Sequence, residues 1–174
     1  MVFISKMPKI ERIKKRHLLK KRAQREYTDR IEKELGAQPA SLDPKVKLEE
    51  GVLDTGDHII LYEGEIIFFE DEGRLLPTLH ALLRGVIKIP TVTVDMGAVR
   101  FVVNGADIMR PGITKIDDGI ASGSVVAIVD ERHGKPLAVG ISKMSTEELR
   151  AASEGKVIMS KHHVNDALWD FGKS

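Results

Sequence analysis

Apolar residues recur at every fourth position in the first part of the chain. They are Leu19, Ala23, Tyr27, Ile31 and Leu35. Residues four positions apart lie on the same face of an α-helix, so this spacing predicts an amphipathic helix over residues 19–35. Gly36 can adopt the left-handed conformation that caps a helix, and we expect the helix to end there.

Two further apolar runs lie close together in the middle of the chain. Residues 57–62 and 65–69 flank the dipeptide Glu63-Gly64, which predicts two strands joined by a tight turn. A short helix is expected over residues 77–85, with Pro77 in its first turn and a glycine at its end. The first half of the chain therefore combines helices and strands.

Beyond Pro90 the pattern changes to short apolar segments separated by Gly and Pro at nearly regular intervals, which is typical of a small barrel or sandwich. Strands are expected at residues 91–95, 106–109, 124–131, 137–142 and 157–159. Two short helices are expected between them, one over residues 97–103 and one starting at Ser145, where Glu148 completes a capping box. The predicted fold class is α+β, with a boundary near Pro90.

Charge is distributed unevenly along the chain. Residues 1–35 carry 12 basic and 5 acidic residues, although the net charge of the whole chain is only +1. No acidic residue interrupts the basic run at residues 12–25, which comprises Arg12, Lys14, Lys15, Arg16, Lys20, Lys21, Arg22 and Arg25. This density suits the neutralisation of phosphates, and it predicts nucleic acid or an acidic protein as partner. The same residues could instead form a solvated helix face.

Composition excludes several classes of protein. The chain has 174 residues and no cysteine, which excludes disulfide-stabilised scaffolds and cysteine-based metal or catalytic sites. No run approaches the ~18 consecutive apolar residues of a membrane span, so we expect a soluble, cytoplasmic protein with no membrane partner. Phosphate-binding loops, nucleophile elbows and dinucleotide fingerprints are missing. We therefore predict a protein that is not an enzyme and binds neither a cofactor nor a metal.

Polar residues near the C-terminus leave several interpretations open. His162, His163 and Asp166 could surround a metal ion, form a hydrogen-bonded turn, or act with Lys161 as RNA contacts. Farther on, Trp169 and Phe171 are expected to anchor the last segment to a core rather than to stack on RNA.

The residues from 94 to 113, VDMGAVRFVVNGADIMRPGI, resemble the opening of a PUA domain, named after pseudouridine synthases and archaeosine transglycosylases. The resemblance continues through residues 125–129, 138–145 and 162–169. The preceding residues 65–69 and 76–79 resemble the pre-PUA domain of the malignant T-cell-amplified-sequence family, which is related to the amino-terminal part of ligatin. The chain looks like an archaeal-type, stand-alone version.

This resemblance implies a pre-PUA α/β domain at residues 1–90 and a β-rich PUA pseudobarrel with short helices at 91–174. It further implies RNA as partner and a place in the translation apparatus, on the small ribosomal subunit. An SUI-type translation factor is a candidate protein partner, and we expect a monomer. The pre-PUA partner contacts are the least transferable part, because the basic N-terminal segment is unusual.

PUA domains receive RNA along their first helix, the following strand and a glycine-containing loop. The matching positions here are Gly97, Ala98, Arg100, Phe101, Gly105, Ala106, Met109, Arg110, Pro111 and Gly112. Arg100 and Arg110 offer planar donor groups that match phosphate oxygens. Phe101 and Met109 could instead be core residues, and the helical spacing favours burial of Phe101 over base stacking.

The resulting hypothesis is a non-catalytic RNA-binding translation factor that recognises tRNA, through its acceptor 3′ end, and small-subunit ribosomal RNA. It would act in initiation, reinitiation or ribosome recycling. One alternative is an accessory RNA-binding subunit of an RNA-modification enzyme, such as a pseudouridine synthase or a tRNA-guanine transglycosylase system. Another is a protein adaptor whose acidic middle, residues 43–72, docks a basic factor. Replacing both Arg100 and Arg110 by Ala is expected to weaken RNA binding without unfolding the protein.

Overall fold

The computed structural model describes residues 9–36, 42–43 and 45–173. These residues form two compact units, each with its own sheet. The first unit contains the described residues up to Lys88 together with the segment from Ala167 onward, and the second unit contains Ile89–Asp166. The C-terminal segment from Ala167 onward, which was expected in the domain at 91–174, belongs to the first unit instead.

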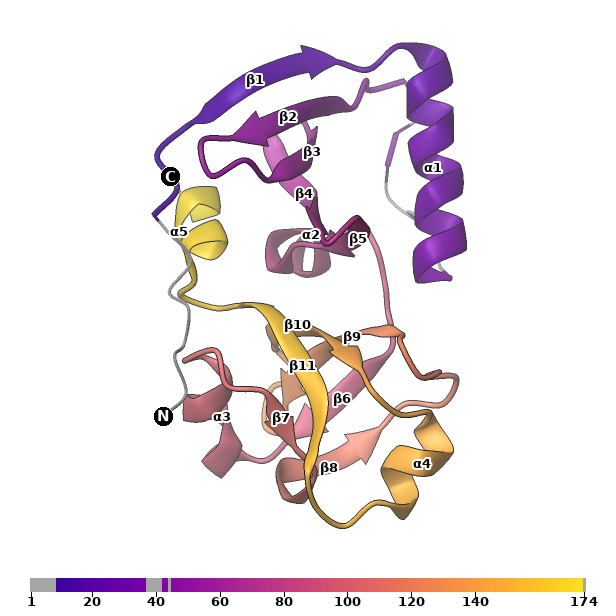
Figure 1. Cartoon of the computed structure of the whole chain (residues 1–174), viewed down its shortest axis with the longest axis vertical. Helices are drawn as coiled ribbons and strands as arrows, with labels where there is room; N and C mark the ends of the chain where they lie inside the picture. The colour runs from indigo at the N-terminus through magenta and orange to yellow at the C-terminus, as the bar shows by residue number, and fades with distance from the viewer. Residues whose placement is uncertain (1–8, 37–41, 44, 174) are drawn as a thin grey trace. The chain divides into compact units, whose positions relative to one another are not determined.

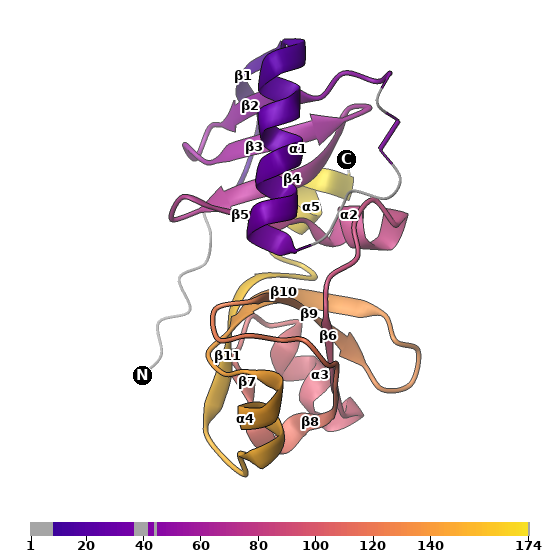
Figure 2. The same ribbon diagram turned by 90° about the vertical axis from the view of Figure 1, so that its right-hand side faces the viewer.

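Five strands of the first unit form an antiparallel sheet in which they lie in chain order (Figure 1). The elements of this unit are β1 (Ile13–Leu18), α1 (Lys21–Leu35), β2 (Glu49–Leu53), β3 (His58–Tyr62), β4 (Glu65–Asp71), β5 (Arg74–Pro77), α2 (Leu79–Arg84) and α5 (Ala167–Lys173). Helix α1 lies across one face of the sheet (Figure 2). Four of the five residues of β3 are buried, so the centre of the sheet is covered on both faces.

Local sequence explains the elements predicted for this unit. Helix α1 buries Ile31 and ends at Gly36, which has a φ of 64°, so the amphipathic helix and its glycine cap are confirmed. Strands β3 and β4 form the predicted hairpin. Its turn residues Glu63 and Gly64 have φ values of 51° and 80°, the geometry of a tight turn that matches the twist of the paired strands.

Two predictions for this unit are wrong in detail. The residues before α1 form β1, an edge strand paired only with β2, which the sequence did not predict. Pro77 does not open a helix, because it ends β5. The next residue, Thr78, caps α2 instead: its hydroxyl oxygen accepts a hydrogen bond from the N–H of Ala81 at 3.1 Å.

The C-terminal helix α5 packs against α2 through aromatic stacking. The rings of His80 and Trp169 lie 4.5 Å apart and within 10° of parallel, and His80 Nε2 is 3.2 Å from the carbonyl oxygen of Trp169. The predicted anchoring role of Trp169 is confirmed, although its partner lies in the first unit. None of the helices in the described part of the chain is long and apolar enough to cross a membrane.

Six strands of the second unit form one sheet in the order β7-β11-β10-β9-β6-β8 (Figure 1). The elements are β6 (Thr91–Val94), α3 (Met96–Val102), β7 (Ile108–Met109), the 3-10 turn η1 (Arg110–Gly112), β8 (Ile113–Ile116), β9 (Val125–Asp130), β10 (Pro136–Ser142), α4 (Thr146–Ala151) and β11 (Lys156–His163). All neighbouring strands are antiparallel except the parallel pair β6 and β9. Every residue of β9 is buried, which makes it the centre of this core.

Most predicted elements of the second unit are present, and the α+β fold class is confirmed. The capping box at the start of α4 forms as predicted: the Ser145 hydroxyl accepts from the Glu148 N–H, and the Glu148 carboxylate accepts from the Ser145 N–H, both at 3.2 Å. Strand β8 was not predicted. Strand β11 extends farther than the three residues expected at 157–159.

Candidate nucleic-acid interface

The ten positions implied by the resemblance occupy one continuous stretch of the second unit. Gly97, Ala98, Arg100 and Phe101 lie on α3, Gly105 and Ala106 follow it, Met109 ends β7, and Arg110, Pro111 and Gly112 form η1. The N–H of Asp95 donates to the carbonyl of Gly112 at 2.8 Å, which holds η1 beside the start of α3. The same Asp95 caps α3 by accepting from the N–H of Ala98 at 2.8 Å.

Phe101 is exposed, which corrects the expectation that it is buried. Its neighbour Val102 points into the core, whereas 54% of Phe101 is accessible to solvent. The guanidinium of Arg100 lies over the Phe101 ring, 4.7 Å from the ring centroid. The guanidinium covers one face of the ring, so a base can stack on the other face while the guanidinium contacts a phosphate.

Met109 is also exposed, at 49%, so the core interpretation is wrong for this residue too. Pro111, two residues farther along the chain on η1, is exposed as well. Gly97 adds an open stretch of backbone, because a Cβ there would meet only the carboxylate of Asp95, at 3.4 Å. These positions leave the surface around α3 and η1 accessible to a ligand.

Gly105 and Gly112 are required by close packing rather than by a ligand. Gly105 has a φ of 88°, and a Cβ there would lie 2.8 Å from His163 Nε2. A Cβ at Gly112 would lie 3.1 Å from the Cβ of Ala98, where η1 approaches α3. Both glycines let backbone segments of this surface approach their neighbours.

Arg110 is engaged within the fold, which changes its expected role. Its Nε donates to the carbonyl of Leu149 on α4 at 2.6 Å, and its Nη1 donates to the carbonyl of Ile113 at 3.1 Å. The carbonyls at the end of a helix have no partner within it, so Arg110 satisfies one of those of α4. The double replacement of Arg100 and Arg110 is therefore expected to disturb folding, contrary to the sequence-based expectation.

His162 is buried and cannot meet RNA from the surface. Only 1% of its side chain is exposed, and its Nδ1 lies 2.7 Å from a carboxylate oxygen of Asp166, which also accepts from the N–H of His163 at 3.0 Å. Of the open interpretations, the hydrogen-bonded turn is the observed one. Lys161 and His163 are half-buried. Among the described residues, no group of three potential ligands is arranged to hold a metal ion.

The basic run at 12–25 lies in the first unit, on β1 and the first turns of α1. All eight of its basic residues are exposed. Arg16 is paired with Glu49 through two hydrogen bonds of 2.6 and 3.0 Å, which hold the pKa of that carboxyl below its usual value. Arg22 lies 3.5 Å from Glu26. Six cations have no ion-pair partner within the described residues: Arg12, Lys14, Lys15, Lys20, Lys21 and Arg25.

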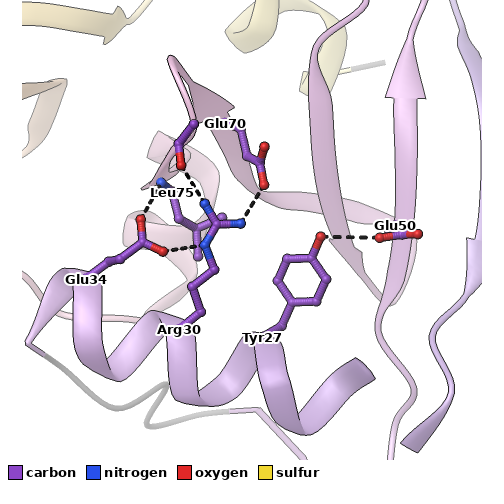
Figure 3. A network of polar contacts seen from close by, with 7 residues as sticks. Tyr27, Arg30, Glu34, Glu50, Glu70 and Leu75 are labelled. Carbon is purple, nitrogen blue, oxygen red and sulfur yellow. Dashed lines mark hydrogen bonds and ion pairs between the residues drawn. The ribbon is translucent and has the colours of Figure 1, made fainter. Parts of the chain in front are cut away.

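A polar network attaches α1 to the sheet and so positions this basic surface (Figure 3). Arg30 pairs with Glu34 on its own helix, with Glu70 at 2.5 Å, and with the carbonyl of Gly73 at 2.7 Å. Glu34 in turn accepts from the N–H of Leu75 at 3.1 Å. One guanidinium thus ties the helix to the β4–β5 turn.

Tyr27 makes the second attachment, one turn earlier on α1. Its hydroxyl donates to the carboxylate of Glu50 on β2 at 3.2 Å (Figure 3). Burial, together with the Glu50 charge, raises the pKa of Tyr27 to about 12. Glu50 also pairs with His17 of β1 at 2.7 Å, so the strand and the helix that carry the basic run share one carboxylate.

Comparison with known proteins identifies the family of this chain. The PUA domain family matches residues 90–164. An uncharacterized protein of Methanocaldococcus jannaschii is 38% identical over 162 residues, which cover 91% of this chain and 98% of that protein. Translation machinery-associated protein 20 of Saccharomyces cerevisiae is 38% identical over 123 residues, 66% of this chain and 68% of the yeast protein. The chain belongs to the family of translation machinery-associated protein 20.

Solved structures of relatives agree with the fold of this family member. A protein of Pyrococcus horikoshii superposes with a TM-score of 0.77 at 31% identity, covering 91% of this chain and 99% of that one. A PUA-domain protein of Aeropyrum pernix gives a TM-score of 0.81 at 26% identity, with 94% and 92% covered. The predicted resemblance is therefore confirmed, and the second unit is called the PUA unit below.

Sequence reasoning missed one basic element of the PUA unit in this family member. Strands are predicted at residues 124–131 and 137–142, but no function was attached to the connection between them. In the structure, the β9–β10 turn at residues 131–135 presents three exposed basic residues, Arg132, His133 and Lys135. In the sequence, this element is indicated only by Arg132 and Lys135, the two cations that flank His133-Gly134.

Proposed function

We propose that this protein is a non-catalytic, cytoplasmic RNA-binding translation factor. Its targets are the acceptor 3′ end of tRNA and ribosomal RNA of the small subunit, in initiation, reinitiation or ribosome recycling. Family membership supports the link to translation, because the yeast relative is named a translation machinery-associated protein. The PUA unit supports RNA as the ligand.

One observation carries the proposal: Phe101 is 54% exposed on α3, with the Arg100 guanidinium 4.7 Å from its ring. Unpaired bases stack on exposed aromatic side chains, and a neighbouring guanidinium can contact the phosphate of the same nucleotide. The acceptor end of tRNA is single-stranded, so its bases are available for stacking and its phosphates for Arg100.

The basic run on β1 and α1 has a different role in this proposal. Its six cations without an ion-pair partner in the described residues supply affinity for phosphates that depends on salt and not on sequence. The PUA unit supplies the selection of single-stranded ends. The protein acts as a monomer, and an SUI-type translation factor is its candidate protein partner.

The test compares tRNA that carries an intact 3′ CCA end with tRNA from which that end has been trimmed. Affinities are measured over a series of salt concentrations for the wild-type protein and for Arg100→Ala and Phe101→Ala. The proposal predicts a marked preference of the wild type for the intact end, which either substitution reduces. Equal affinity for both RNAs with a steep salt dependence would instead assign binding to the basic run.

A further inference from the structure

We propose that the β9–β10 turn at residues 131–135 is a second phosphate-binding element of the PUA unit, which extends the RNA path beyond α3. This inference rests on the proposed function, because it adds a contact to the same RNA interface. Arg132 and Lys135 are the residues that bind the RNA backbone.

The turn is held rigidly by the carboxylate of Asp130. This buried side chain accepts from the N–H of His133 at 2.6 Å and from the N–H of Lys135 at 3.3 Å, and the carbonyl of Asp130 accepts from Gly134 at 2.9 Å. These N–H groups, that of His133 first, hold the pKa of Asp130 below its usual value, so it is ionised at neutral pH. Its negative charge faces the turn, where the backbone N–H groups of His133 and Lys135 bind it.

Hydrogen bonds from Glu131 fix this turn against the start of α3. The N–H of Glu131 donates to the carbonyl of Val94 at 3.0 Å, and its carboxylate accepts from the N–H of Met96 at 3.2 Å. Arg132 follows directly in the chain, and Gly97 follows Met96. The start of the turn, where Glu131 precedes Arg132, therefore lies beside the end of α3 that carries the open backbone of Gly97.

The outward side of the turn is cationic and available. Arg132 and Lys135 are exposed, and neither has an ion-pair partner within the described part of the chain. Both carboxylate oxygens of buried Asp130 accept from backbone N–H groups, and one oxygen of the exposed Glu131 carboxylate accepts from the N–H of Met96. The fixed backbone determines where the guanidinium and ammonium groups are presented, and both groups bind phosphate oxygens.

A matched pair of lysines provides the test. Lys135 directly precedes β10 and Lys143 directly follows it, so these two exposed lysines lie at opposite ends of one strand. Binding of a fluorescently labelled tRNA with an intact 3′ CCA end is measured between 50 and 200 mM salt. The variants are Lys135→Ala, Lys143→Ala, the double variant Arg132→Ala/Lys135→Ala, and Arg100→Ala as a reference for the α3 surface.

The inference predicts that Lys135→Ala weakens binding about threefold and the double variant about tenfold, and that each lost contact reduces the salt slope by about 0.7–0.9. Lys143→Ala should bind like the wild type. If Arg100→Ala weakens binding while the double variant matches Lys143→Ala, the inference is wrong and the proposed function stands. If the wild type does not bind this tRNA at 50 mM salt, the proposed function and the inference fail together.

Discussion

Replacing Arg110 by Ala should destabilise the PUA unit rather than abolish a contact with RNA. The side chain donates to two carbonyl oxygens, those of Leu149 at 2.6 Å and Ile113 at 3.1 Å. Residues 110 and 149 are 39 positions apart, so the guanidinium joins η1 to the end of α4. Ala at this position leaves both carbonyls without their charged donor.

The size of the effect follows from the chemistry of the lost bonds. A hydrogen bond from a charged group contributes ~1.5–3 kcal/mol, but Arg110 is only half-buried and water can replace part of what is lost. We expect about 2 kcal/mol for the two bonds together. In a chain of this length that corresponds to a decrease in Tm of roughly 4–8 °C. Arg100 is exposed, and its cation–π contact with Phe101 contributes only about 0.5–1 kcal/mol.

The assay compares Arg110→Ala with Arg100→Ala in thermal unfolding, amide hydrogen exchange of α4, and tRNA binding. Arg110→Ala should lower Tm and speed up exchange in α4, whereas Arg100→Ala should weaken binding at nearly unchanged Tm. An Arg110→Ala protein with wild-type Tm and α4 exchange, but a reduced salt slope of binding, would refute this reasoning. Arg110 would then be a free phosphate donor, as the sequence alone suggested.

Three further predictions concern the elements that support the two surfaces. Arg30→Ala removes the clamp between α1 and the β4–β5 turn, and we expect a loss of about 2–3 kcal/mol in chemical denaturation, with faster amide exchange in α1. Gly105→Ala places a Cβ 2.8 Å from His163 Nε2 at a φ of 88°, which should cost about 1–3 kcal/mol; an unchanged Tm would contradict the packing described. Because folding raises the pKa of Tyr27 to about 12, this residue contributes stability that is complete below pH ~10 and is lost as the pH rises toward 12. The free energy of unfolding of Tyr27→Phe should therefore fall less than that of the wild type between pH 10 and 12, by about 1–2 kcal/mol.

Elements whose apolar residues follow one clear period could be predicted from the sequence. Helix α1 shows a four-residue repeat that ends at Gly36, and the β3–β4 hairpin follows from two apolar runs separated by Glu63-Gly64, which adopts a tight turn. Strand β1 has no such signal. It is an edge strand exposed at five of its six positions, so its residues alternate between two solvated faces and carry charges on both.

The candidate interface could be located from the sequence, but the roles of its side chains could not. Phe101 and Val102 are adjacent on α3, and helical spacing alone does not determine which of them faces the core. Arg110 meets a carbonyl 39 residues away, a contact that depends on tertiary structure. The burial of His162 against Asp166 likewise follows from the path of β11.

The most direct test of RNA binding by the PUA unit is a map of the residues that respond to tRNA. Amide chemical shifts of the isotope-labelled protein would be followed while tRNA with an intact 3′ CCA end is added. We predict the largest changes on α3, at residues 105–112 and in the turn at 131–135, with smaller changes on β1 and α1. Changes confined to β1 and α1, or absent throughout, would contradict the assignment of RNA recognition to the PUA unit.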